Sequence, residues 1–201
     1  IDQSLSEFRL VAAADRLRLP IVMNLIWQAT NGNLEMLERA IVSAPEARLE
    51  LASFLVEQSQ FDAATRVFGQ IDRDSRLKSQ ASGRFFDLML KAGQWQSAGR
   101  LWRNTVVGAE ENERELLWNG SFEHQVPKWL MHFDWQLGQS KFARFQLSTV
   151  RAHSGQRSLT ISYQGMDTTK LDGEVHRLVL VQPGTSYRLE FFARTEQLLT
   201  P

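Results

Sequence analysis

The sequence predicts a two-part fold, in which α-helices fill residues 1–115 and an antiparallel β-sandwich fills residues 116–201. Two observations predict it. Up to about residue 115, apolar residues recur at spacings of three and four, which is the period of an amphipathic helix. Beyond that point apolar and polar residues alternate, which is the period of a half-buried strand. The change of period places the domain boundary near residues 110–117, which include an acidic stretch.

The helical half repeats itself at a constant interval. Each copy has an aromatic residue, a small residue three positions later and an aromatic residue four positions after that: Phe61, Ala64 and Phe68, then Trp95, Ala98 and Trp102. We call the offset from Phe61 to Trp95 the repeat interval. On a helix these spacings place the three side chains on one face. The small residue lets a neighbouring helix approach closely, so we expect all six residues to be buried between paired helices.

A shorter copy of the pattern begins at Leu34, which is closer to Phe61 than one repeat interval, and we expect it to be degenerate or to have a clipped second helix. The pattern and its interval resemble the second helix of a tetratricopeptide repeat. The resemblance implies a helical solenoid whose inner face, on the first helix of each repeat, binds a partner protein. An ordinary solvated face is the alternative. The residues predicted on that face are Ser53, Glu57, Arg84, Asp87 and Lys91.

Alternating residues in the β half predict strands at four places: 143–147, 159–163, 175–181 and 187–193, with a fifth near 118–122. Pro183 and Gly184 predict a type II turn before the last of them. One apolar face of these strands requires cover. We therefore expect either an extensive contact with the helices or a homodimer through the β half.

Four motifs follow one another in the β half: Asn-Gly-x-Phe-Glu at 119–123, a segment around Trp135, His-Ser-Gly-x-x-Ser-Leu at 153–159, and Pro-Gly-x-x-Tyr at 183–187. Their order resembles the carbohydrate-binding-module jelly rolls of families 4, 9 and 22. The resemblance implies an eight-stranded, two-sheet sandwich that binds a polysaccharide. Residues 117–201 are too few to complete it, so we expect a truncated, partial jelly roll.

This resemblance also implies three site residues. Trp129 and Trp135 are candidates for stacking on sugar rings, although the apolar surroundings of Trp135 favour a core position. Glu123 is a candidate ligand of a structural calcium ion, together with backbone carbonyls near the His-Ser-Gly turn at 153–155. No other cofactor is expected.

Composition excludes several classes of function. The 23 basic and 23 acidic residues give no net charge, which argues against binding nucleic acid through bulk electrostatics. The chain has no cysteine, so disulfides and thiolate metal sites are excluded. The longest apolar stretch, residues 19–27, is too short to span a membrane. Motifs of nucleotide-binding loops, zinc proteases and serine hydrolases are missing, which favours a protein that is not an enzyme.

The function expected from these features is a non-catalytic adaptor that binds a protein partner through its helices and, in its β half, a polysaccharide. By resemblance this suggests bacterial envelope or exopolysaccharide machinery, in the periplasm or cell envelope rather than the cytoplasm. The chain begins with Ile1, which indicates a fragment. An accessory part of a larger polysaccharide-synthesising or polysaccharide-degrading enzyme is therefore the alternative. In a third interpretation the β half is only a structural cap on the helices.

Overall fold

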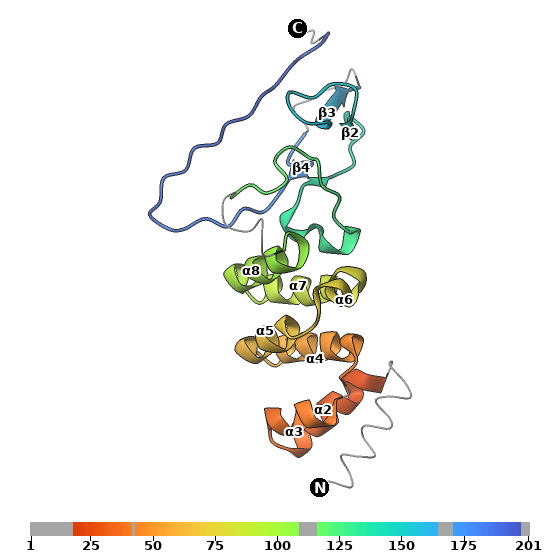
Figure 1. Cartoon of the computed structure of the whole chain (residues 1–201), viewed down its shortest axis with the longest axis vertical. Helices are drawn as coiled ribbons and strands as arrows, with labels where there is room; N and C mark the ends of the chain where they lie inside the picture. The colour runs from red at the N-terminus through yellow and green to blue at the C-terminus, as the bar shows by residue number, and fades with distance from the viewer. Residues whose placement is uncertain (1–17, 42, 109–115, 165–170, 198–201) are drawn as a thin grey trace. The chain divides into compact units, whose positions relative to one another are not determined.

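The computed structural model describes residues 18–41, 43–108, 116–164 and 171–197. As predicted, the N-terminal part is helical and antiparallel strands follow it (Figure 1). The strands form only two small two-stranded sheets among the described residues. No helix in these ranges is both long enough and apolar enough to cross a membrane.

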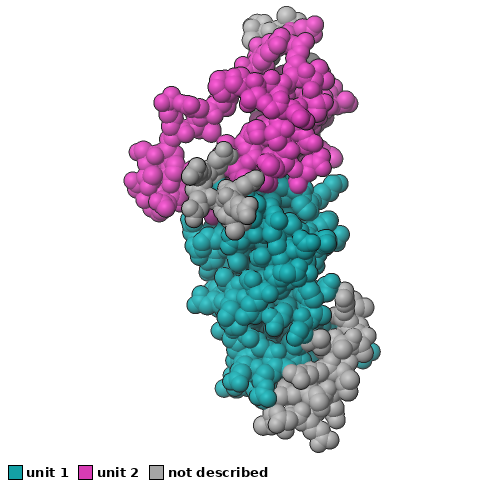
Figure 2. Space-filling model, viewed as in Figure 1, with its two compact units in different colours: residues 1–115, 126–134 teal, residues 116–125, 135–201 magenta. Residues whose placement is uncertain are grey.

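The chain divides into two compact units, which are coloured separately in Figure 2. The helical unit comprises residues 1–115 and 126–134, and the β unit comprises residues 116–125 and 135–201. Segment 126–134 therefore belongs with the helices, although the change of sequence period predicts it in the β half.

Seven α-helices of the helical unit are described. They are α2 (Leu19–Ala29), α3 (Leu34–Ala40), α4 (Pro45–Glu57), α5 (Phe61–Gly69), α6 (Arg73–Lys78), α7 (Ala81–Lys91) and α8 (Trp95–Val106). A 3₁₀ helix, η2 (Lys128–Phe133), completes the unit. Figure 1 shows α2 and α3 in one layer, α4 and α5 in the next, and α6, α7 and α8 in a third. The second helix of the first layer is clipped, because α3 has 7 residues where α5 has 9 and α8 has 12.

The repeat interval recurs in the geometry of the turns. Helices α5 and α8 begin one repeat interval apart, at Phe61 and Trp95. In the turn before each, Ser59 and Gly93 have positive φ angles of 59° and 75°. This left-handed conformation favours glycine, so Ser59 holds it at some cost in strain. The next amide closes each turn by donating to the carbonyl five residues earlier: Gln60 to Leu55 at 2.8 Å and Gln94 to Met89 at 2.9 Å.

Four of the six repeat residues predicted to be buried are buried. Ala64, Ala98 and Phe68 are fully inaccessible and Trp102 is 3% exposed. The prediction is wrong for the remaining two, because Trp95 is 46% exposed and Phe61 is only half-buried. Both are the first residue of their helix. A helical side chain leans toward the N-terminus of its helix, so at the first position it extends past the packed interface.

An aromatic cluster joins the second and third layers. The ring of Phe68 on α5 stacks on that of Phe85 on α7, with 4.2 Å between centroids and an interplanar angle of 10°. The ring of Phe86 meets both edge-on, at 5.2 and 5.5 Å. The guanidinium of Arg76 lies 5.5 Å from the Phe68 centroid, and its burial lowers its pKa. These ring and cation contacts join α5, α6 and α7 within the described core.

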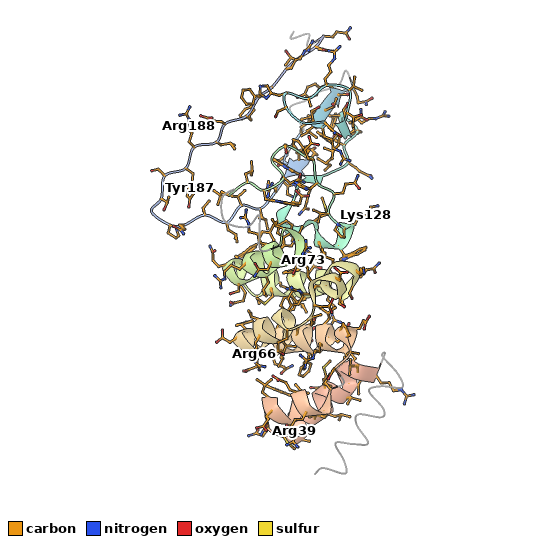
Figure 3. All side chains as sticks on the ribbon, viewed as in Figure 1. Arg39, Arg66, Arg73, Lys128, Tyr187 and Arg188 are labelled. Atoms are coloured by element: carbon orange, nitrogen blue, oxygen red, sulfur yellow. The ribbon has the colours of Figure 1, made fainter. Side chains whose placement is uncertain are left out.

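Arg73 ties α6 to the end of α8 (Figure 3). Its Nε donates to the carbonyl of Thr105 and its Nη2 to that of Val106, both at 2.9 Å. Carbonyls in the last turn of a helix lack intrahelical donors, and a cation also complements the negative end of the helix dipole. Arg73 therefore caps α8 from a neighbouring helix.

The β unit contains two antiparallel pairs of strands. Strand β2 (Ala143–Ser148) pairs with β3 (Ser158–Tyr163), in a register that places Ala143 opposite Tyr163. Strand β1 (Gln136–Leu137) pairs with β4 (Val175–His176). The strands predicted at 143–147 and 159–163 are therefore confirmed.

The other predicted strands are wrong in extent or in kind. Only Val175 and His176 of the predicted 175–181 strand are paired, residues 118–122 form a turn, and residues 187–193 form no strand. The predicted turn is present, with Gly184 at φ 74° and a 3.3 Å bond from the Thr185 amide to the Gln182 carbonyl. A strand needs a neighbour for its backbone groups. Residues 187–193 have none within the described part of the chain, so their alternation alone does not make a strand.

Candidate functional site

The face predicted to bind a protein carries ion pairs that cross from α4 to α7. Arg84 on α7 reaches two carboxylates, those of Glu50 at 3.1 Å and Glu57 at 3.0 Å. The two glutamates are two helical turns apart and so share one face of α4. Glu50 is missing from the sequence prediction, although it stands one repeat interval before Arg84, so the interval was a signal that could have found it.

The exposed residues of α7 form a stripe. Arg84, Asp87 and Lys91 follow one another at spacings of three and four, and all three are exposed. The Asp87 carboxylate lies 2.9 Å from Nε2 of His132 in η2. Exposed ion pairs contribute little stability because water competes for both charges. A partner can therefore replace these ion pairs with little loss in the stability of the fold.

Ser53 lies apart from this stripe. It is 1% exposed, and its Oγ is buried without a hydrogen-bond partner among the described residues. The reason is the position of α4, which contacts α2, α5, α6 and α7 and is thus an inner helix of the unit. Ser53 contributes to helix packing rather than to an exposed surface.

Trp129 lies in the helical unit and helps to cover α6 and α7. Its indole N–H donates to the carbonyl of Leu77 at 3.2 Å. Its backbone carbonyl occupies the space that a Cβ on Gly83 would fill. Gly83 thus permits η2 to approach α7 closely. The contacts of Trp129 are those of a packing residue.

The same segment also covers α8. The indole N–H of Trp102 donates to the carbonyl of Leu130 at 2.5 Å, and the ring of Phe133 lies 5.6 Å from that of Trp102. Leu130 is fully buried and Phe133 is 5% exposed. Residues 126–134 therefore close one end of the helical core. Nothing in the local sequence around Trp129 signals this role, because its partners lie far away in the chain.

Trp135 is half-buried within the β unit. Its indole N–H donates to the Asn119 carbonyl at 2.9 Å. The ring of Phe122 lies 5.1 Å from its ring, and the Arg177 guanidinium lies 5.2 Å from it. These are packing contacts within the β unit, and the Trp135 side chain is not fully buried.

The Asn-Gly-x-Phe-Glu motif folds into a loop around Asn119. The Asn119 side chain bridges to the backbone of His124, accepting from its N–H at 2.9 Å and donating to its carbonyl at 3.2 Å. Asn119 and Phe122 have positive φ angles of 58° and 64°. Asparagine tolerates this conformation better than most residues. The motif is thus accounted for by loop structure.

Glu123 reaches the His-Ser-Gly turn, as the resemblance implied, but its carboxylate binds amides there. Its Oε1 accepts from the backbone N–H groups of Gln156 and Arg157 at 2.8 and 2.9 Å. Gly155, at φ 72°, has no Cβ that would collide with this carboxylate. Calcium requires six to eight oxygen ligands. The described residues contain no cluster of three His, Cys, Asp or Glu side chains suited to a metal ion.

A small hollow lies among α3, α4 and α5, with a cavity volume of only about 10 Å³. It is lined by Glu38, Ile41, Arg48, Leu51, Val67 and Gln70. Pockets for small ligands are usually about 300–1,000 Å³. The Glu38 carboxylate at its rim binds the guanidinium of Arg66 of α5 at 2.5 Å, and this hydrogen bond raises the pKa of Arg66. Arg66 is labelled in Figure 3.

Comparison with models of known protein families, with curated proteins and with solved structures finds no match.

Proposed function

We propose that the helical unit is a tetratricopeptide-like array that binds a partner protein through the exposed face of α4 and α7. The observation that carries the proposal is the repetition of the turns at Ser59 and Gly93, one repeat interval apart. The same interval separates the buried residues Ala64 and Ala98. Arrays of this kind stack helix pairs and present the first helix of each pair on an inner surface.

The charges on this face suit an extended peptide that carries both acidic and basic side chains. Arg84, at 49% exposure, is held between two carboxylates, and Lys91 lies at the end of the same stripe. A peptide carboxylate that reaches Arg84 exchanges one exposed ion pair for another. The protein thus acts as a non-catalytic adaptor. Polysaccharide binding stays a prediction. The contacts of Trp129, which lies in the helical unit, and of Trp135, which lies in the β unit, do not favour it over a packing role.

Selection of peptides from a random displayed library on the whole chain tests the proposal. We expect selected peptides to bind in solution, and Arg84→Ala and Lys91→Ala to weaken their affinity by about fivefold or more each, within the range of interface contacts worth over about 1 kcal/mol. Arg100→Ala is the matched control, since Arg100 is an exposed arginine on α8. Affinity that falls equally with Arg100→Ala, or peptides that bind regardless of all three substitutions, contradicts the proposed face.

A further inference from the structure

Residues 187–192 expose a run of large apolar side chains. Leu189, Phe191 and Phe192 are 72%, 78% and 76% exposed, and Tyr187 is 47% exposed. Figure 1 draws this segment as an extended trace without a strand arrow, and Figure 3 labels Tyr187 and Arg188 on it. Single exposed apolar residues are common, but several large ones gathered in one short segment mark an interaction surface.

The segment is complementary to itself. When two copies run antiparallel with Leu189 opposite Leu189, Arg188 of each copy faces Glu190 of the other. On the other face of the ribbon, Tyr187 lies opposite Phe191. Opposite charges and paired aromatic rings directly across an antiparallel pair are stabilising.

Neighbouring registers lose this match. A shift of one residue places Leu189 opposite Glu190 and Arg188 opposite Phe191. A shift of two residues places Glu190 opposite Glu190, or Arg188 opposite Arg188, according to its direction. Like charges in directly opposite positions are destabilising. The charge pattern therefore selects one register and one orientation.

Contacts within the chain hold residues 192–196, which follow the proposed pairing segment, in place. The ring of Phe192 stacks on that of His153, with 3.7 Å between centroids. Glu196 forms ion pairs with Arg151 and Arg194. Before this anchor, the Arg188 guanidinium binds the Glu190 carboxylate at 2.6 Å on the exposed surface. Residues 187–191 are thus the part that remains open to another chain.

We propose that residues 187–191 become a β-strand by pairing, antiparallel and centred on Leu189, with the same segment of a second copy of this chain. The second copy is the occupant that the charges favour. Each copy carries both Arg188 and Glu190, so each of these residues faces its opposite charge on the other copy. The absence of net charge means that no bulk repulsion opposes the approach of two copies. The exposed ribbon is short, so we expect a reversible dimer rather than an obligate one.

Analytical ultracentrifugation of the whole chain over a series of concentrations tests the proposal. We expect the dimer fraction to rise with concentration in the wild type. Arg188→Glu and Glu190→Arg each place like charges across the ribbon, so each variant alone should be monomeric. An equimolar mixture of the two variants should dimerise again, because each then faces a partner of opposite charge at both positions.

A second mixture separates this pairing from general attraction between oppositely charged variants. Arg144→Glu changes an exposed arginine of β2 by the same charge as Arg188→Glu. Alone it should dimerise like the wild type, and mixed with Glu190→Arg it should not restore the heterodimer. A wild type that stays monomeric at every concentration overturns the proposal. So does a dimer that survives both single variants, or rescue that occurs equally in both mixtures.

Discussion

The two units differ in whether they bury their phenylalanine side chains. In the helical unit Phe68, Phe85 and Phe86 are fully buried, whereas in the β unit Phe191 and Phe192 are more than three-quarters exposed. A helix satisfies its backbone hydrogen bonds within one segment and only then has to cover an apolar stripe. A strand satisfies neither its backbone nor its apolar face without a neighbour. The difference shows that apolar alternation predicts the capacity to pair, and that a partner completes the strand.

One substitution made in both units gives the largest expected contrast. Phe85→Ala empties a fully buried site in the stack with Phe68 and should cost about 3–5 kcal/mol of unfolding free energy. Phe191→Ala removes a ring that is 78% exposed and should change that energy by less than about 0.5 kcal/mol in dilute solution. Urea denaturation followed by circular dichroism measures both. Similar losses for the two variants would mean that Phe191 is also buried.

Two glycine substitutions test how closely residues 126–134 approach α7. Gly83→Ala should destabilise the helical unit by about 1–3 kcal/mol, because the new Cβ meets the Trp129 backbone, which cannot rotate away as a side chain can. Gly69→Ala in α5 is the control, since nothing lies within 4 Å of its Cβ position. It should stabilise the unit by about 0.4–1 kcal/mol through the unfolded state. If alanine stabilises at both positions, the Trp129 contact is absent in solution.

The smallest effect concerns the acid stability of α6. The Asp72 carboxylate caps this helix by accepting the Ser75 amide at 2.8 Å, and that hydrogen bond lowers the pKa of Asp72. A lowered folded-state pKa contributes stability above the unfolded pKa, and the contribution is lost as pH falls through the folded value. Asp72→Asn keeps a good cap and should leave neutral stability nearly unchanged while flattening the decline at acid pH.

Asn33 offers the reverse exchange. Its Oδ1 caps α3 by accepting the Met36 amide at 3.1 Å, without a titrating group. Asn33→Asp should therefore steepen the acid decline that Asp72→Asn flattens. Melting temperatures between neutral and strongly acid pH measure both variants. Parallel curves for wild type and Asp72→Asn would show that the cap does not bind a carboxylate preferentially.

Sequence periodicity predicted the elements whose backbone hydrogen bonds join residues that are near one another in the sequence. The helices containing Ala64 and Ala98 follow from the repeat, and the β2–β3 pair joins strands separated by a short connection. The segment 187–193 has the same alternation as β3 and yet no partner among the described residues. Periodicity describes the faces of a segment, and it carries no information about whether a neighbour is present.

The exposure of the candidate site residues was predictable only where it depends on a residue's position on its own helix. Arg84 and Lys91 are exposed as the spacing on α7 predicts. Ser53 stands one repeat interval before Asp87, in the equivalent position, but is buried because α4 has helices on several sides. The contact of Glu123 with the turn at Gly155 joins residues far apart in the sequence, and only the resemblance pointed to it.

Native-state hydrogen exchange on the whole chain tests most directly the claim that the helical unit is closed by residues 126–134 while residues 187–193 lack a partner strand. The amide of Leu130 donates to the Pro127 carbonyl at 2.8 Å. It should exchange through an opening reaction with the same free energy as the amides of α7 and α8. Amides of residues 188–192 should exchange at nearly unprotected rates in dilute solution. An amide of Leu130 that exchanges with β2 and β3, or protection across 188–192 at concentrations where the chain is monomeric, would contradict the account.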